Sequence, residues 1–203
     1  MRKLFPTEKL QNIATPFYYY DTDLLRKTLQ TIKEEVARHE RFVMHYAVKA
    51  NANAKLLRII SEAGFGADCV SGGEIAAARG AGFPASKIVY AGVGKSDWEI
   101  ESGLEHDIFS FNVESEAELE VKNELAGKHN KKARVAFRIN PNVGAHTHAH
   151  ITTGLAENKF GIAMEDMQTI IAKAASMDHV ECIGLHFHIG SQILEMDDFV
   201  ALC

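Results

Sequence analysis

The stretch GADCVSGGEIAAARGAGFPASKIVYAGVGKSDWEI at residues 66–100 repeats one pattern twice. An apolar run at Ala67–Val70 precedes a helical segment at Gly73–Arg79. A second apolar run at Ile88–Ala91 precedes a helix that begins near Asp97. Short apolar runs bounded by turn residues predict buried strands, and strands that alternate with helices predict a parallel sheet.

The same alternation continues on both sides of this stretch. The further predicted strands are Phe42–Val48, Ile108–Asn112, Arg134–Ile139 and Val180–Ile189, and the further predicted helices are Lys55–Ala63, one capped by Ser115, Met164–Met177 and Met196–Cys203. Glu118 follows Ser115 at the spacing of a capping box. A short aromatic strand at Phe17–Tyr20, ahead of any helix, and a helix capped by Asp21 or Thr22 come before these units. The pattern therefore predicts six βα units.

An α/β fold of this kind is either an open doubly wound sheet or a TIM-type (β/α) barrel. An open sheet concentrates its site at one switch point, whereas polar and small residues here follow every predicted strand, which favours the barrel. GVGK at 92–95 is only a weak match to a phosphate loop. A complete barrel has eight units and about 250 residues. We therefore expect 203 residues to supply a partial barrel at 37–203, preceded by an N-terminal segment at 1–36.

Composition excludes several classes of function. The chain is 46% hydrophobic and 24% charged, with a net charge of −5, so we expect no nucleic-acid partner. Its apolar runs are too short to span a bilayer, so we expect no membrane association. Three sparse cysteines suit the reducing cytoplasm better than a disulfide framework.

Charged side chains stand at the ends of three predicted strands. Lys49 closes the first, where it is either the polar residue that ends the strand or a desolvated amine that acts as a nucleophile. Asp68 lies on the second strand and could simply cap the next turn. Arg138 closes the fifth and could form a structural ion pair with Asp68.

Histidines and a Gly-Ser turn follow the sixth strand. His186 and His188 are two residues apart, so they share one side of a strand and could form half of a metal site. HTHAH at 146–150 lies in a long loop that could also bind a metal but reads better as an active-site loop. Gly190 and Ser191 can present N–H and hydroxyl donors to a phosphate. A Schiff-base lysine, a ring that stacks and a phosphate turn together match pyridoxal phosphate.

Several motifs carry a specific resemblance to a known family. They are YAVKAN at 46–51, GADCVSGGE at 66–74, FNVES at 111–115, RINPNV at 138–143, TTG…NKFGI at 152–162 and GLHFHIGSQ at 184–192. From about Thr15 to its last residue, the chain resembles the diaminopimelate decarboxylases, which belong to the alanine racemase-like, fold-type III pyridoxal-phosphate enzymes. HIGSQ and the TG…KFG stretch favour this branch over the ornithine decarboxylases.

The resemblance implies a fold, a cofactor and residue roles. It implies that the enzyme decarboxylates meso-diaminopimelate to L-lysine. Lys49 and His188 are the expected catalytic residues. Lys49 is expected to bind pyridoxal 5'-phosphate covalently, and the His188 ring is expected to stack on it. Gly190 and Ser191 are expected to hold the phosphate, and Asp68 and Arg138 to form a pair that orients the lysine and the cofactor edge.

Members of this family form homodimers and contain a β-rich second domain. We expect Phe17–Tyr20 to supply a strand to that domain. The glycine-rich phosphate loop and the substrate-binding arginines lie beyond the sixth strand in this family. We therefore expect the chain to be an N-terminal portion that is inactive alone.

Three other functions remain open from the sequence. The chain could be a non-catalytic barrel that binds pyridoxal phosphate on Lys49. It could belong to a polyamine-pathway decarboxylase that acts on ornithine, arginine or carboxynorspermidine. A metal-dependent hydrolase built on His186, His188 and the HTHAH loop is the third.

Overall fold

The computed structural model describes residues 6–141, 160–191 and 193–203. The strands in these ranges are β1 His45–Ala47, β2 Gly66–Cys69, β3 Ile88–Tyr90, β4 Ser110–Val113, β5 Ala133–Asn140, β6 Ile162–Ala163 and β7 Val180–His186. The α-helices are α1 Thr7–Leu10, α2 Thr22–Val36, α3 Ala54–Glu62, α4 Gly72–Gly80, α5 Asp97–Glu105, α6 Glu116–Lys128, α7 Met167–Ala175 and α8 Asp197–Leu202. Short 3₁₀ turns occupy Val48–Ala50, Ala85–Lys87 and Met164–Asp166.

The strands form one parallel sheet whose order follows the chain. The order is β1-β2-β3-β4-β5-β6, and β7 also pairs with β5. A doubly wound sheet reverses its strand order at a switch point, and no reversal occurs among the described strands. The predictions of a (β/α) barrel and of six successive βα units are therefore confirmed. Within the described residues β1 and β7 do not pair with each other, so the barrel is partial.

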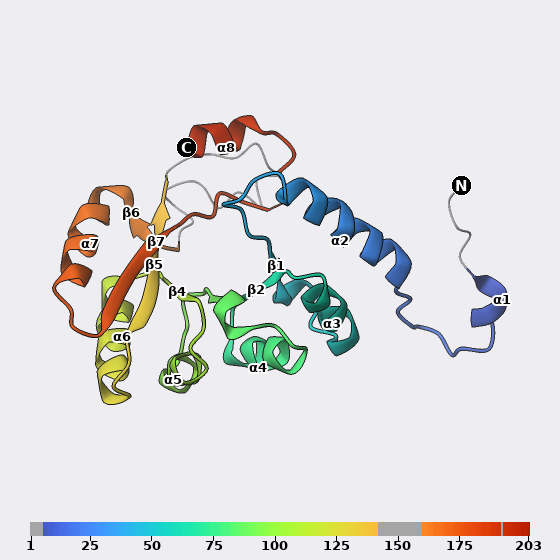
Figure 1. Ribbon diagram of the computed structural model, residues 1–203, viewed down its shortest axis with the longest axis horizontal. Helices are drawn as coiled ribbons and strands as arrows, with labels where there is room; N and C mark the ends of the chain where they lie inside the picture. Colours follow the sequence, from blue (N-terminus) through green and yellow to red (C-terminus); the bar gives the residue numbers. More distant parts are fainter. Residues whose placement is uncertain (1–5, 142–159, 192) are drawn as a thin grey trace.

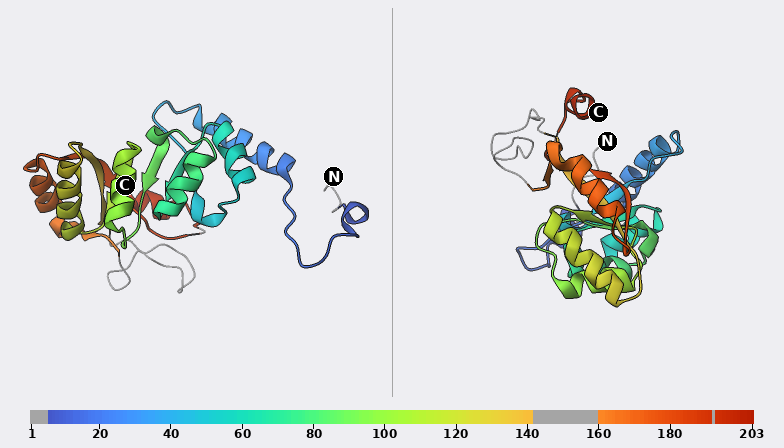
Figure 2. Two further views of the ribbon diagram at one scale, coloured as in Figure 1. Left: turned by 90° about the horizontal axis from the view of Figure 1, so that it is seen from below. Right: turned by 90° about the vertical axis from the view of Figure 1, so that its left-hand side faces the viewer.

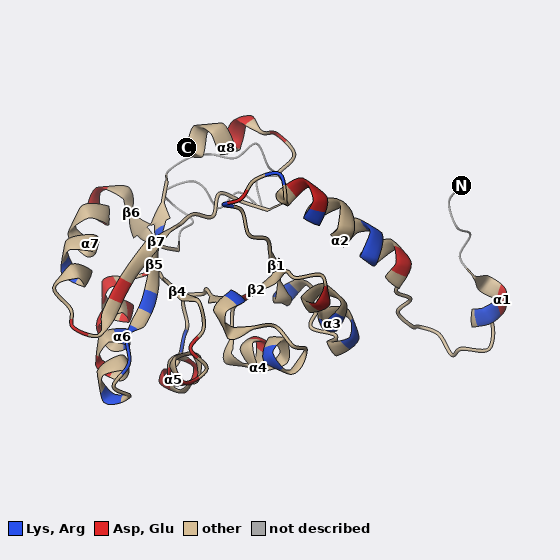
Figure 3. Ribbon diagram, in the orientation of Figure 1, with Lys and Arg blue, Asp and Glu red and all other residues tan. Residues whose placement is uncertain are grey.

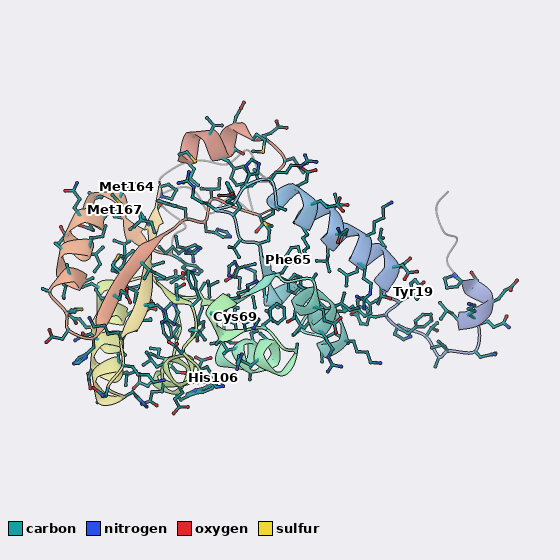
Figure 4. The ribbon with its side chains drawn as sticks, in the orientation of Figure 1. Tyr19, Phe65, Cys69, His106, Met164 and Met167 are labelled. Carbon is teal, nitrogen blue, oxygen red and sulfur yellow. The ribbon has the colours of Figure 1, made fainter. Side chains whose placement is uncertain are left out.

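The helices α3 to α7 form a single layer along one face of the curved sheet (Figures 1 and 2). The main hydrophobic core lies between that layer and the sheet, where Cys69 and Phe65 are buried (Figure 4). Among the largest fully buried side chains of this core are Tyr90, Phe111, Phe137, Leu57, Ile75 and Leu119. In the described part of the chain, no helix combines the length and the hydropathy that crossing a bilayer requires.

The alternation of burial along β5 separates the two faces of the sheet. Val135 and Phe137 are fully buried in the core, whereas the alternating positions Ala136 and Arg138 keep some exposure. Successive side chains of a strand point to opposite faces, so Arg138 lies on the face away from the helix layer. This inner face is where polar side chains gather.

The N-terminal segment differs from its prediction. No strand forms at Phe17–Tyr20, because a strand needs a hydrogen-bonding neighbour and no described strand runs alongside it. The short helix α1, which buries no residue, precedes it. Tyr20 instead accepts a hydrogen bond from Asn51 Nδ2 at 3.0 Å. The assignment of this segment to a second domain stays a prediction. The helix predicted next is confirmed as α2, with Asp21 as its N-cap.

Two strands are shorter than predicted by three residues or more, and one strand was not predicted. Phe42, Val43 and Met44 are exposed and lie outside β1, and β7 ends at His186 rather than Ile189. The two-residue strand β6, which pairs with the end of β5, was not predicted. Apolar character alone overestimated β1 and β7, because the regular pairing of each covers only part of its apolar run.

Position 66 on β2 requires a glycine, because the His45 ring and the Lys87 carbonyl oxygen lie close to its Cα. A Cβ there would overlap the His45 ring and lie 2.6 Å from the Lys87 carbonyl oxygen. We expect Gly66→Ala to lower the free energy of unfolding by about 1–3 kcal/mol, because the strand and ring must shift to make room. Chemical denaturation measures this. The control is Gly80→Ala at the end of α4, where a Cβ meets nothing within 4 Å; an equal loss in both variants would contradict the steric argument.

Candidate functional site

Lys49 lies directly after β1, at the carboxyl edge of the sheet. Pairing with β2 ends where Ala47 faces Asp68, and the chain then turns through the 3₁₀ segment that contains Lys49. Val48 fills the core, while Lys49 is exposed. The Lys49 side chain is therefore not desolvated in the described structure. Its amine is open to a ligand and lies close enough to Asp68 to influence it electrostatically.

Asp68 is half-buried on β2. Burial raises the pKa of Asp68 above its usual value, and Glu74 adds to the rise, whereas Lys49 and Arg138 oppose it. Lys49, Asp68 and Arg138 come from three different strand ends, so the structure brings together the charged residues that the sequence singled out.

Arg138 has a different ion-pair partner from the one predicted. Its Nη1 donates to both carboxylate oxygens of Glu114, at 2.9 and 3.0 Å, and the two side chains are 12% and 3% exposed. Glu114 Oε1 also accepts from the Gly92 backbone N–H at 3.0 Å. The guanidinium carbon lies 5.4 Å from the centre of the Phe160 ring. The predicted pairing of Arg138 with Asp68 is thus replaced by a pair with Glu114, which follows the neighbouring strand β4 and lies closer.

His186 lies beside Arg138, because these two residues are paired across β7 and β5. Among the described residues no partner bonds its buried Nδ1. Burial lowers the pKa of His186 to about 4, with further lowering from Arg138, His188 and Lys95. His188 follows the strand rather than lying on it. Burial also lowers the pKa of His188, and Arg138 and Lys49 act in the same direction.

We expect His186 to make the stability of the chain sensitive to acid. Its pKa falls from 6.5 to about 4 on folding, so the unfolded state binds more protons between these values and stability is lost as the pH drops through that window. His186→Gln is expected to remove about 1–3 kcal/mol of this loss. Urea unfolding at pH 7 and pH 4.5 measures it, with the exposed His39→Gln as control. Equal acid sensitivity in the wild type and His186→Gln would contradict the expectation.

Gly190 and Ser191 follow the buried Ile189. Gly190 has φ +150°, a conformation that L side chains rarely adopt, so glycine is required at this turn. Ser191 is exposed, which leaves its hydroxyl accessible. Their role in holding a phosphate stays a prediction.

The described part of the chain adds no further ligand to the metal site that His186 and His188 could begin. There, no three His, Cys, Asp or Glu side chains are grouped so that they could hold a metal ion. The HTHAH stretch at 146–150 and much of the TTG…NKFGI motif lie outside the described residues, as does Gln192.

Glu114, Lys95 and Glu118 are site neighbours that the sequence reasoning missed. Lys95 belongs to GVGK, but its Nζ donates to the Gly92 and Asn112 carbonyl oxygens and to Glu118, so the weak phosphate-loop match is not a phosphate site. Figure 3 shows acidic and basic residues interspersed along the helices rather than gathered by sign. The sequence signal that could have identified these neighbours was the pair Glu114 and Glu118, which lie directly after β4 and in the first turn of α6.

Comparisons with known proteins agree with this arrangement. Residues 22–202 match the family described as pyridoxal-dependent decarboxylase, pyridoxal binding domain. The chain is 67% identical over its whole length to the diaminopimelate decarboxylase of Bacteroides thetaiotaomicron, of which it covers 53%. It is 42% identical, over 95% of its length, to that of Aquifex aeolicus, of which it covers 45%.

Among solved structures, the diaminopimelate decarboxylase of Helicobacter pylori, complexed with L-lysine, is similar. It matches with a TM-score of 0.91 and 40% identity, over 96% of this chain and 49% of that one. The chain thus spans about half the length of the curated relatives it matches.

Proposed function

Because the chain belongs to the pyridoxal-dependent decarboxylases, we propose that it forms the cofactor-binding part of a diaminopimelate decarboxylase. The reaction is the conversion of meso-2,6-diaminopimelate into L-lysine and carbon dioxide. The observation that carries the proposal is 67% identity, along the entire chain, to a relative of that name. The L-lysine bound in the Helicobacter pylori structure supports the same substrate class.

The residues at the carboxyl edge of the sheet fit pyridoxal phosphate. The buried Nδ1 of His186 has no partner among the described residues, which suits a site that a polar ligand completes. Lys49 offers an exposed amine beside a carboxylate, and Gly190 gives a turn in which backbone N–H groups can face an anion. When bound, pyridoxal phosphate withdraws electrons from the substrate carbon that loses carbon dioxide.

Each residue then has a definite task. Lys49 would supply the amine that holds the cofactor covalently. His188 provides a flat ring for stacking, and its lowered pKa keeps that ring neutral at pH 7. The Gly190 backbone and the Ser191 hydroxyl would hold the phosphate. Asp68 orients the Lys49 ammonium, while Arg138 is held in place by Glu114.

The full-length gene product that contains this chain provides the test. It is supplied with pyridoxal phosphate and, separately, with meso-diaminopimelate, ornithine, arginine or carboxynorspermidine, and released carbon dioxide and amine product are measured. Carbon dioxide and lysine from diaminopimelate alone are expected. Release from a polyamine precursor instead would reassign the substrate, and cofactor binding without any carbon dioxide would make the protein a non-catalytic binder.

The assembly belongs to the same proposal. We expect a homodimer with a small amino acid as substrate, as the family resemblance implies, and the three sparse cysteines suit a location in the cytoplasm. Sedimentation of the full-length protein at micromolar concentration tests the dimer, and a purely monomeric species would refute it.

A further inference from the structure

A buried network of charges connects α6 to the candidate site. We call Lys95, Glu118, Lys122 and Glu114 the α6 network. Lys95 and Lys122 are 1% and 0% exposed, and both donate to Glu118 Oε1. Charged side chains are almost never this buried unless they are paired, so the network has a fixed geometry.

Lys95 ties this network to two strand ends. An ammonium group has three donors, and Lys95 uses them on Glu118 at 2.7 Å, on the Asn112 carbonyl oxygen at 2.8 Å and on the Gly92 carbonyl oxygen. Asn112 lies on β4, and Gly92 follows β3. Lys95 therefore fixes the position of the Gly92 peptide relative to β4.

Glu114 is held from both sides by groups that Lys95 fixes. The Gly92 N–H donates to the Glu114 carboxylate, and the Glu114 backbone N–H donates to Glu118 Oε2 at 2.9 Å. The same Glu114 carboxylate accepts two hydrogen bonds from Arg138. Hydrogen bonds thus connect Lys95 to Arg138 through the Gly92 backbone and the Glu114 carboxylate, and Arg138 is paired across the sheet with His186.

We propose that Lys95 is a positioning residue of the cofactor site, acting through Gly92 on Glu114 and so on Arg138. The proposal rests on the proposed function, because it takes pyridoxal phosphate as the ligand. It gives the GVGK motif a role that differs from phosphate binding. Without Lys95, the Gly92 peptide loses its anchor, and the Arg138 guanidinium loses its defined place beside His186.

Lys122 provides a matched control inside the same network. It is as buried as Lys95 and donates to the same oxygen of Glu118, and its ammonium lies 5.5 Å from the centre of the Phe111 ring. Its contacts in the described structure do not include Gly92 or Asn112. A purely structural role of the network predicts similar behaviour for the two lysines, whereas positioning predicts a difference.

The experiment compares Lys95→Met and Lys122→Met in the full-length gene product. Pyridoxal phosphate is titrated against each variant, its dissociation constant is measured by visible absorbance, and covalent labelling of Lys49 is measured after borohydride reduction. We expect Lys95→Met to weaken cofactor binding by about tenfold, the effect of one charge-assisted hydrogen bond, and Lys122→Met to change it by less than about twofold. Unfolding midpoints are recorded in parallel.

Each outcome is decisive. Equal dissociation constants for the two variants would overturn the proposal, whatever their stability. Should Lys95→Met not fold, Glu114→Gln must reproduce the tenfold loss, because it weakens the grip on Arg138 while keeping the side-chain volume; wild-type affinity in that variant would also overturn it. A wild-type protein that binds no pyridoxal phosphate would refute the proposed function instead.

Discussion

Lys49→Ala in the full-length gene product is expected to abolish covalent attachment of pyridoxal phosphate. Alanine has no amine, so borohydride reduction should leave no labelled peptide, and the absorbance band near the visible edge should disappear. Lys49 is exposed in a 3₁₀ turn, so its truncation removes no core contact. The unfolding free energy should therefore stay within about 0.5 kcal/mol of wild type.

The control for this variant is Lys55→Ala. Lys55 is another exposed lysine, in the first turn of α3, six residues further along the chain. It should retain both the band and the label. Label that persists in Lys49→Ala on a different lysine would show that Lys49 is only the polar end of a strand. Loss of folding would assign Lys49 a structural role.

Arg138→Met is expected to lower the free energy of unfolding of the chain by about 3–5 kcal/mol. Methionine keeps much of the aliphatic volume but leaves the Glu114 carboxylate, 3% exposed, with the Gly92 N–H as its remaining described donor. An uncompensated buried charge is costly, since it has lost water without gaining a partner. Guanidinium unfolding at pH 7 measures the loss.

Two further variants isolate the buried charge as the cause. Arg26→Met removes a cation 3.9 Å from Glu62, where both side chains are more than half exposed, and should cost less than about 1 kcal/mol. The double variant Arg138→Met with Glu114→Gln removes both charges and should recover part of the loss. A cost below about 1 kcal/mol for Arg138→Met would mean that water reaches Glu114.

The sequence predicted the order and type of most elements because these depend on local patterns. Apolar runs such as Ile88–Ala91 and the cap at Ser115 are read from neighbouring residues, and Ser115 accepts from the Glu118 N–H as its spacing predicts. The exposure of Lys49 was not predictable in this way. It depends on where pairing with β2 stops, which is a property of two segments.

The sequence predicted most of the residues of the candidate site, but it did not predict the contacts between them. Lys49, Asp68 and Arg138 were identified because polar residues after parallel strands share one edge of the sheet. The partner of Arg138 was predicted wrongly, because two carboxylates stand at this edge of the sheet, Asp68 on β2 and Glu114 directly after β4. Only the strand order places Glu114, and not Asp68, beside the strand that carries Arg138. Lys95 was missed because its long side chain turns back into the core.

The strand order described above also determines how the chain can begin to fold while it is being made. From β2 to β5, each strand pairs with the strand before it in the sequence, so the edge to which each new strand adds has already been synthesised. Contacts between neighbouring units have short loops to close, and sheets built from distant segments do not share this advantage. A ribosome-bound chain that has emerged as far as α6 already contains every strand with which β1, β2 and β3 pair in the described residues. Synthesis from the N-terminus and assembly of the sheet therefore proceed in the same direction.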